Sequence, residues 1–226
     1  MVQLWQKVYI FLMDKRHVEV YGKQDAPCPL VVLNTVNGEG NAVYEAVRSS
    51  DITLMAVDGL SWNDDLSPWA APAVFRNGES FGGRADSYIV ELVSSMIPGV
   101  VREYSLRPSC MIIAGYSLAG LFAVYSAYRT DMFSRIVSVS GSLWFPGFLE
   151  YALSNSMKAD PEKVYLSLGD REARTGNPVM KTVQDNTERL HEHFQGLGIS
   201  SEFELNPGNH FQDAVLRMAK GIRSVL

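Results

Sequence analysis

Short apolar runs alternate with amphipathic stretches along most of the chain, and this alternation restricts the possible folds more than any other feature. Runs such as 30–34 and 111–114 are almost entirely apolar, which is typical of strands buried on both faces. The stretch 118–128, which follows the second run, has the periodicity of a helix. Strands that alternate with helices predict an α/β fold with a mostly parallel sheet and helices on both faces.

An antiparallel start precedes this part, because strand-like segments at 8–13 and 18–21 flank a polar turn. Pro98 is expected to end the helix predicted over 86–97, since proline lacks the N–H that a helix interior needs. The irregular stretch 58–84 is expected to be an ordered loop that faces a substrate. Further strands are expected at 52–57, 136–139, 164–168 and 202–205, and further helices at 42–49, 147–157, 178–195 and 212–225.

Composition narrows the function classes. The 226 residues, 46% of them hydrophobic, suffice for one core, so we expect a single domain over 1–226. A net charge of -5 argues against nucleic acid as a partner. No apolar run approaches the ~18 residues of a membrane span, and no leader precedes the first strand, so we expect a cytoplasmic protein without a membrane partner. Two isolated cysteines predict neither a disulfide framework nor a metal site.

Ser117 lies in the segment MIIAGYSLAG, where an apolar strand passes directly into a helix. This pattern predicts a nucleophile elbow, in which a sharp turn holds the serine hydroxyl clear of the backbone. The turn needs small residues two before and two after the serine, and Gly115 and Ala119 occupy these places. The common pattern has glycine where Ala119 stands. A serine that merely caps a helix is the alternative interpretation.

A serine nucleophile needs a base, and four histidines are available. His17 lies in the N-terminal strand region, and His191 and His193 fall within one predicted helix, two residues apart. His210 follows the last predicted strand in the turn-rich segment NPGNH, from which a base can reach Ser117 at the edge of the sheet. A capping or surface role is the alternative for His210.

The base in turn needs a carboxylate, which should follow the strand 164–168 in the order serine, acid, histidine. The sequence there offers both Asp170 and Glu172, and spacing alone does not choose between them. A surface ion pair with a neighbouring arginine is the alternative for the acid that is not used.

An oxyanion formed at Ser117 would need two backbone N–H donors. Leu118 supplies one by its position, and the second is expected from the loop after strand 30–34, at Thr35 or Val36. The glycines of this loop also fit a plain connection. A phosphate-binding loop is disfavoured because its motifs are missing.

Aromatic side chains gather near the predicted strand ends and are expected to line an apolar substrate pocket, with core packing as the alternative for each. The candidates are Trp69, Phe81, Trp144 and Tyr116.

With these residues in place, the chain resembles the putative-esterase branch of the α/β-hydrolases, which contains esterase D, feruloyl esterase domains and enterobactin-type siderophore esterases. The resemblance covers most of the chain and rests on GYSLAG, FGGRADSYIVEL, VSVSGSLWFPGF, LSLGDRE and PGNHF. It implies a serine hydrolase without a metal or organic cofactor, with Ser117 as nucleophile and His210 as base. It also favours Glu172 over Asp170, because several relatives place the acid three residues after a glycine, here Gly169.

We therefore expect a serine carboxylic ester hydrolase that forms an acyl-enzyme on a small-molecule ester. Acyl transfer to a hydroxyl or thiol acceptor is one alternative, and a non-catalytic binding module with a hydrolase-like fold is another. The identity of the ester, whether a siderophore lactone, an aromatic ester or a thioester, and the oligomeric state stay open.

Overall fold

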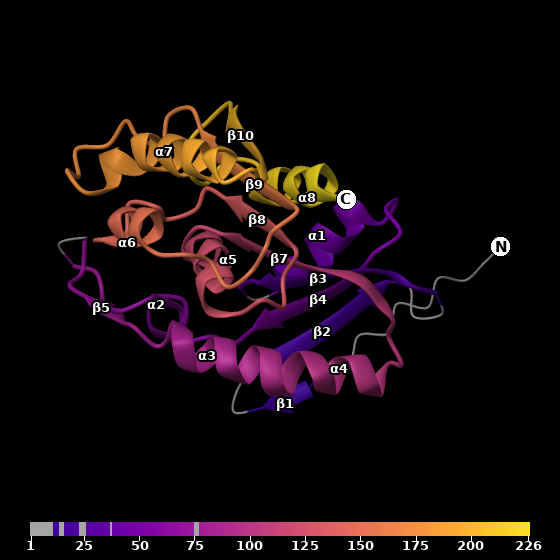
Figure 1. Ribbon diagram of the computed structural model, residues 1–226. Helices are drawn as coiled ribbons and strands as arrows, with labels where there is room; N and C mark the ends of the chain where they lie inside the picture. Colours follow the sequence, from indigo (N-terminus) through magenta and orange to yellow (C-terminus); the bar gives the residue numbers. More distant parts are fainter. Residues whose placement is uncertain (1–10, 14–15, 23–25, 37, 75–76) are drawn as a thin grey trace.

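The computed structural model describes residues 11–13, 16–22, 26–36, 38–74 and 77–226. Within them, one eight-stranded sheet forms the centre of the molecule, in the order β1-β2-β4-β3-β7-β8-β9-β10 (Figure 1). The strands are β1 (Phe11–Met13), β2 (Arg16–Gly22), β3 (Cys28–Asn34), β4 (Thr53–Asp58), β7 (Pro108–Tyr116), β8 (Arg135–Val139), β9 (Lys163–Gly169) and β10 (Ser200–Asn206).

The pairing directions confirm the predicted sheet. β2 runs antiparallel to both β1 and β4, whereas all pairs from β4 to β10 are parallel. The antiparallel start is thus present, although residues 8–10 and 14–15 of the predicted segments lie outside the described residues.

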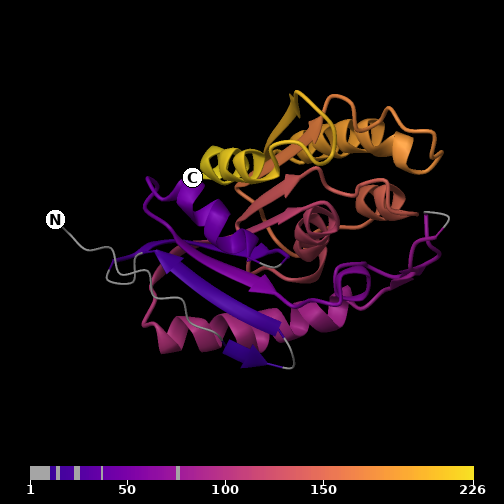
Figure 2. The same ribbon diagram turned by 180° about the vertical axis from the view of Figure 1, so that it is seen from behind.

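Side chains of β3 alternate between two buried faces, which explains its apolar run over residues 30–33. Leu30 and Val32 pack into one core cluster, and Val31 and Leu33 into another. The second face is covered by α1 (Glu39–Val47) and α8 (Ala214–Val225), which lie side by side (Figure 2). The first face is covered by α3 (Ala85–Glu91), α4 (Ile97–Glu103), α5 (Leu118–Arg129), α6 (Phe148–Ser154) and α7 (Val183–Gly196).

The helix predicted to end before Pro98 continues through it, so that prediction is wrong. A π-helical segment, η1 (Leu92–Met96), joins α3 to α4. There the N–H of Ile97 donates to the carbonyl of Leu92, five residues earlier. This wider turn lies immediately before Pro98. In a regular α-helix, the proline ring would clash with the carbonyl oxygen of the residue four positions earlier. The π-helical turn changes the hydrogen-bond pattern at that point, and the helix can continue to Glu103.

The loop predicted over 58–84 contains short ordered elements. They are α2 (Trp62–Asp65) and a small hairpin of β5 (Ala70–Ala71) and β6 (Phe81–Gly82). The helix predicted over 178–195 begins as a 3-10 turn, η2 (Met180–Thr182), and continues as α7.

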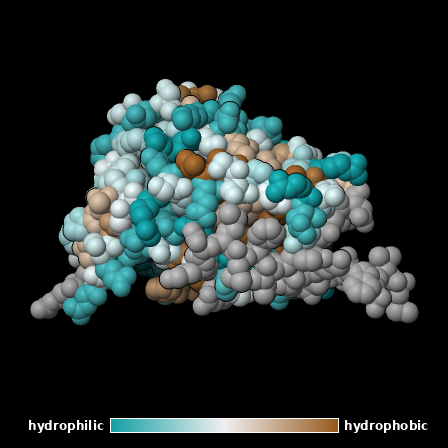
Figure 3. Space-filling model, turned by 90° about the horizontal axis from the view of Figure 1, so that it is seen from below, coloured by the Kyte–Doolittle hydropathy of each residue, from teal (hydrophilic) through white to brown (hydrophobic). Residues whose placement is uncertain are grey.

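The surface on the side of α3 and α4 is mainly hydrophilic among the described residues, with hydrophobic residues in small separate patches (Figure 3). Among the helices of the described residues, none has both the length and the apolar character that a membrane crossing requires.

The register of the parallel strands brings their carboxyl ends to one edge of the sheet. Asn34 pairs with Gly115, Tyr116 with Val139, and Gly169 with Asn206. The residues that follow these ends therefore enter loops at the same edge, where ligands usually bind in parallel α/β sheets. All the predicted reactive side chains belong to these loops.

Candidate active site

Ser117 occupies a tight turn between β7 and α5, with φ 58° and ψ -122°. Positive φ is uncommon for a residue with a side chain and costs on the order of 1–3 kcal/mol. The surrounding structure holds this conformation. The N–H of Ser117 donates to the carbonyl of Val139 at 3.0 Å, and its carbonyl accepts the N–H of Ser142 at 2.9 Å. The helix that begins next is locked into the core, since every residue of 118–128 is buried.

Gly115 permits this turn because no other residue fits at its position. A Cβ added there would lie 2.2 Å from the carbonyl oxygen of Ala119. The methyl group of Ala119 itself is accommodated, since this residue is completely buried within the core. The departure from glycine at residue 119 is therefore compatible with the turn.

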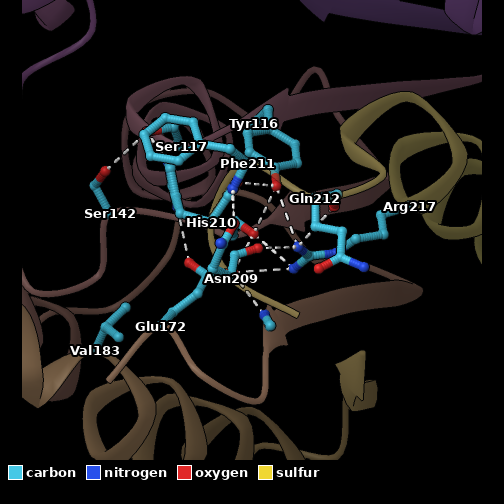
Figure 4. Close-up of polar contacts among 12 residues, drawn as sticks. Tyr116, Ser117, Ser142, Glu172, Val183, Asn209, His210, Phe211, Gln212 and Arg217 are labelled. Carbon is cyan, nitrogen blue, oxygen red and sulfur yellow. Dashed lines mark hydrogen bonds and ion pairs between the residues drawn. The ribbon is translucent and has the colours of Figure 1, made fainter. Parts of the chain in front are cut away.

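Three predicted side chains form one hydrogen-bonded chain (Figure 4). Nε2 of His210 lies 3.1 Å from Oγ of Ser117, and Nδ1 lies 2.8 Å from Oε2 of Glu172. His210 is 30% exposed, whereas Glu172 is only 5% exposed. The histidine thus faces solvent beside Ser117, while the carboxylate lies behind it.

The other oxygen of Glu172 is held by three donors. Oε1 accepts the Ser140 hydroxyl and the Gly169 N–H, both at 2.6 Å, and Nη2 of Arg217 at 3.1 Å. Burial by itself would raise the pKa of Glu172, but the hydrogen bonds from His210, Ser140 and Gly169 outweigh it and lower the pKa to about 2. Glu172 is therefore ionised at neutral pH.

Asp170, the alternative acid, has a different partner. Its Oδ1 accepts the backbone N–H of Gly208 at 2.9 Å and lies 3.8 Å from Nε of Arg171. The structure thus brings Glu172, and not Asp170, to the imidazole of His210.

The remaining histidines have partners outside this group. Nδ1 of His17 lies 3.5 Å from Asp58 on the antiparallel part of the sheet. Nδ1 of His191 lies 2.9 Å from the hydroxyl of Ser201, and His193 packs against Phe194 of its own helix.

Of the three predicted oxyanion donors, Leu118 and Val36 remain candidates, and Thr35 does not. Leu118 is the first residue of α5, and the first N–H groups of a helix have no acceptor within it. The N–H of Thr35, by contrast, donates to the carbonyl of Val57 at 2.9 Å, which continues the pairing of β3 with β4. That group is occupied, and the expectation that Thr35 offers it is corrected. Val36 is 45% exposed at the same edge of the sheet.

The predicted pocket aromatics differ in their surroundings. Phe81 is only 7% exposed and packs against Trp144 and Phe145, so core packing explains it better than a pocket. Trp69 is partly buried, donates from Nε1 to the carbonyl of Pro146 and packs against Tyr151. Trp144 is partly buried at the surface of the same cluster.

Tyr116 supports the histidine. Its ring packs against that of His210, and its hydroxyl donates to the backbone carbonyl of His210 at 2.6 Å. It also lines a cavity of about 50 Å³ together with Thr35, Trp62 and Val215. Beside His210, the ring of Phe211 is 88% exposed.

Two buried polar residues of the site were not predicted from the sequence. Ser140 follows β8 at the same sheet edge, in a positive-φ conformation of 48°, and Arg217 lies on α8. A signal for Arg217 was present, because helical periodicity places it on the apolar face with Gly221 and next to Met218. A charged side chain on that face requires a buried partner.

The described residues contain no group of three or more His, Cys, Asp or Glu side chains that could hold a metal ion.

The strand order, the helices on both faces and the loops at one sheet edge define an α/β-hydrolase fold. A family model described as "Putative esterase" matches residues 15–216, and the chain belongs to this family. Family membership supports ester hydrolysis as the reaction class.

Two similar solved structures agree with this fold, and a third known protein is similar in sequence. The siderophore hydrolase EstA of Aspergillus nidulans superposes with a TM-score of 0.75 at 18% identity, covering 96% of this chain and 93% of that one. The enterobactin esterase FES of Shigella flexneri gives 0.69 at 17% identity, with 97% of this chain and 58% of that one. The uncharacterized protein YbbA of Bacillus subtilis is 23% identical over 164 residues, which is 71% of this chain and 66% of its own length.

Proposed function

We propose that the protein is a serine carboxylic ester hydrolase that acts on a small-molecule ester through an acyl-enzyme. The observation that carries this proposal is the chain of hydrogen-bonding distances from Oγ of Ser117 through His210 to Glu172, 3.1 Å and 2.8 Å. Both are within the reach that proton transfer from a nucleophile to its base requires. In this assignment Ser117 stands at a nucleophile elbow, and its strained backbone presents the hydroxyl to His210.

In the first half-reaction, Oγ of Ser117 attacks the ester carbonyl carbon while its proton passes to Nε2 of His210. The imidazolium that forms is stabilised by Glu172, which is ionised because its pKa is about 2. Collapse of the tetrahedral intermediate breaks the bond to the alcohol, which takes the proton from Nε2. A water molecule then attacks the acyl-enzyme while His210 takes its proton. Collapse of the second tetrahedral intermediate breaks the bond to Oγ of Ser117, which takes the proton back from Nε2 as the acid leaves.

The negative oxygen of the tetrahedral intermediate needs donors on the side away from His210. We assign this role to the N–H groups of Leu118 and Val36. Leu118 opens α5, so the positive end of the helix dipole adds to the effect of its N–H group.

The test is hydrolysis of aryl esters of increasing acyl length by the wild type and by Ser117→Ala. The wild type should be active and the variant should lose activity by several orders of magnitude while unfolding at the same urea concentration. A fluorophosphonate probe should label only the wild type. A folded Ser117→Ala variant as active as the wild type would refute the proposal.

The two alternatives give different results in the same assays. Acyl transfer shares the acyl-enzyme, so a hydroxyl or thiol acceptor would then give an acylated product in place of the free acid. A non-catalytic binding module would be neither labelled by the probe nor active on any ester of the panel.

A further inference from the structure

Arg217 is a buried cation at the centre of the candidate site that the proposed mechanism does not yet use. It projects from α8 and is only 3% exposed. A buried guanidinium is costly unless charged and polar partners surround it. Nη1 and Nη2 of Arg217 have such partners on two sides, the acid and the loop that carries the base.

On the side of the acid, Nη2 of Arg217 donates to the Ser140 hydroxyl at 2.6 Å and to Oε1 of Glu172 at 3.1 Å. Ser140 in turn donates to the same Oε1. The two carboxylate oxygens are therefore divided. Oε1 is fixed by Arg217, Ser140 and the Gly169 N–H, and Oε2 faces Nδ1 of His210. Rotation of the carboxylate away from the histidine would break three hydrogen bonds.

On the side of the loop, Nη1 of Arg217 contacts the carbonyls of Asn209 at 3.3 Å and Gln212 at 3.4 Å. It also donates at 3.2 Å to the hydroxyl of Tyr116, which itself donates to the carbonyl of His210. Figure 4 shows the guanidinium reaching these groups from the side of α8. The backbone on both sides of the histidine is thus connected to Arg217.

We propose that Arg217 is a positioning residue that fixes the base and its carboxylate relative to each other, and thereby to Ser117. This inference rests on the proposed hydrolase function. Only arginine can serve both sides at once, because its planar fork presents two NH₂ groups in fixed directions, whereas the lysine ammonium is a single compact donor centre. A misplacement of about 1 Å at a reacting group can lower a rate on the order of 10²-fold.

The first test compares Arg217→Lys with Arg223→Lys, a matched control on the same helix whose exposed guanidinium binds the carbonyl of Ala46. Active sites are titrated with a fluorophosphonate, so that kcat refers to folded enzyme. Arg217→Lys should lower kcat on the order of 10²-fold and leave KM nearly unchanged. Arg223→Lys should keep wild-type values. Wild-type kcat in Arg217→Lys would overturn the proposal, because the positive charge alone would then suffice.

The second test is chemical rescue of Arg217→Ala by free guanidinium, at concentrations far below those that unfold the wild type. Guanidinium should raise kcat at least several-fold, whereas sodium chloride at equal ionic strength should not. A folded variant that gains nothing from guanidinium contradicts the proposal. If the alanine variant does not fold, Arg217→Lys decides the question.

Failure of this inference is distinguishable from failure of the proposed function. In the first case Ser117→Ala is inactive while Arg217→Lys retains full kcat. In the second case Ser117→Ala retains activity.

Discussion

Oδ1 of Asp170 accepts the backbone N–H of Gly208 at 2.9 Å and so connects the end of β9 to the loop before His210. The nearby Glu172 is the carboxylate that lies against the imidazole, at 2.8 Å. The two acids lie only two residues apart in the sequence but have different partners. Asp170 accepts a backbone N–H, and Glu172 contacts the side chain of His210.

Amide substitution of the two acids should separate these roles. Glu172→Gln should lower kcat on the order of 10⁴-fold, because a neutral amide neither stabilises the imidazolium nor fixes its tautomer. Asp170→Asn should keep kcat within a few-fold, since an amide oxygen still accepts the Gly208 N–H. Steady-state kinetics on an aryl ester measure both. Equal losses in the two variants would contradict the assignment of Glu172.

The second oxyanion donor can be tested by removing one backbone N–H. Val36→Pro deletes that group and should lower kcat about 10²- to 10³-fold, as expected for loss of one oxyanion donor. Val36→Ala keeps the N–H and serves as control, with kcat near that of the wild type. Urea unfolding establishes that both variants are folded. A folded proline variant with unchanged kcat would mean that another group supplies the second donor.

Two glycine-to-alanine changes should have opposite effects on the free energy of unfolding, because the two glycines have different surroundings. Gly115→Ala should lower the free energy of unfolding by about 1–3 kcal/mol, because the new methyl would overlap a backbone oxygen in a packed core. Gly99→Ala in α4 should raise it by about 0.5–1 kcal/mol, since a Cβ there meets no atom within 4 Å and alanine favours the helix. Equilibrium urea unfolding measures both, and a neutral Gly115→Ala would refute the steric explanation.

The lowered pKa of Glu172 predicts a pH dependence of stability. A carboxyl whose pKa falls from 4.5 in the unfolded chain to about 2 in the folded protein stabilises the fold above pH 4.5. The contribution is no more than about 3 kcal/mol and decreases as the pH falls from 4.5 towards 2. The difference in unfolding free energy between wild type and Glu172→Gln should therefore shrink over this range. A difference that is constant between pH 5 and pH 3 would contradict the shift.

Two phenylalanines near the site should respond differently to truncation. Phe81→Ala should lower the unfolding free energy by about 3–5 kcal/mol, because the ring is buried against Trp144 and Phe145. Phe211→Ala, at an 88% exposed ring, should change it by less than about 0.5 kcal/mol. Thermal or urea unfolding measures both effects. Comparable losses would mean that Phe211 is covered in solution.

The alternation of apolar and amphipathic segments in the sequence predicted the parallel sheet, and with it the features that depend on the order and direction of the strands. That Ser117, Glu172 and His210 lie together could be predicted because parallel strands bring their carboxyl ends to one edge, whatever the separation in sequence. Spacing alone could not select Glu172 over Asp170. The outcome depends on the turn in which the N–H of Glu172 donates to the carbonyl of Gly169, and on the Asp170 contact with Gly208.

Two features that the sequence did not predict have different causes, one in a local turn and the other in contacts between distant segments. The chain continues as a helix through Pro98 because a π-helical turn precedes it, and no propensity rule for single residues anticipates that turn. Arg217 contacts Ser140 and Tyr116, which lie on other elements, so its role became visible only when α8 was placed on the sheet.

The position of α8 also has a consequence for biosynthesis. His210 follows Ser117 by 93 residues, and Arg217 comes later still, within α8. A ribosome-bound chain therefore exposes the serine well before the histidine, its carboxylate and the arginine are in place. In the proposed mechanism Ser117 has no base until the segment with His210 reaches the sheet edge, and Arg217 fixes that segment only when α8 packs on the sheet.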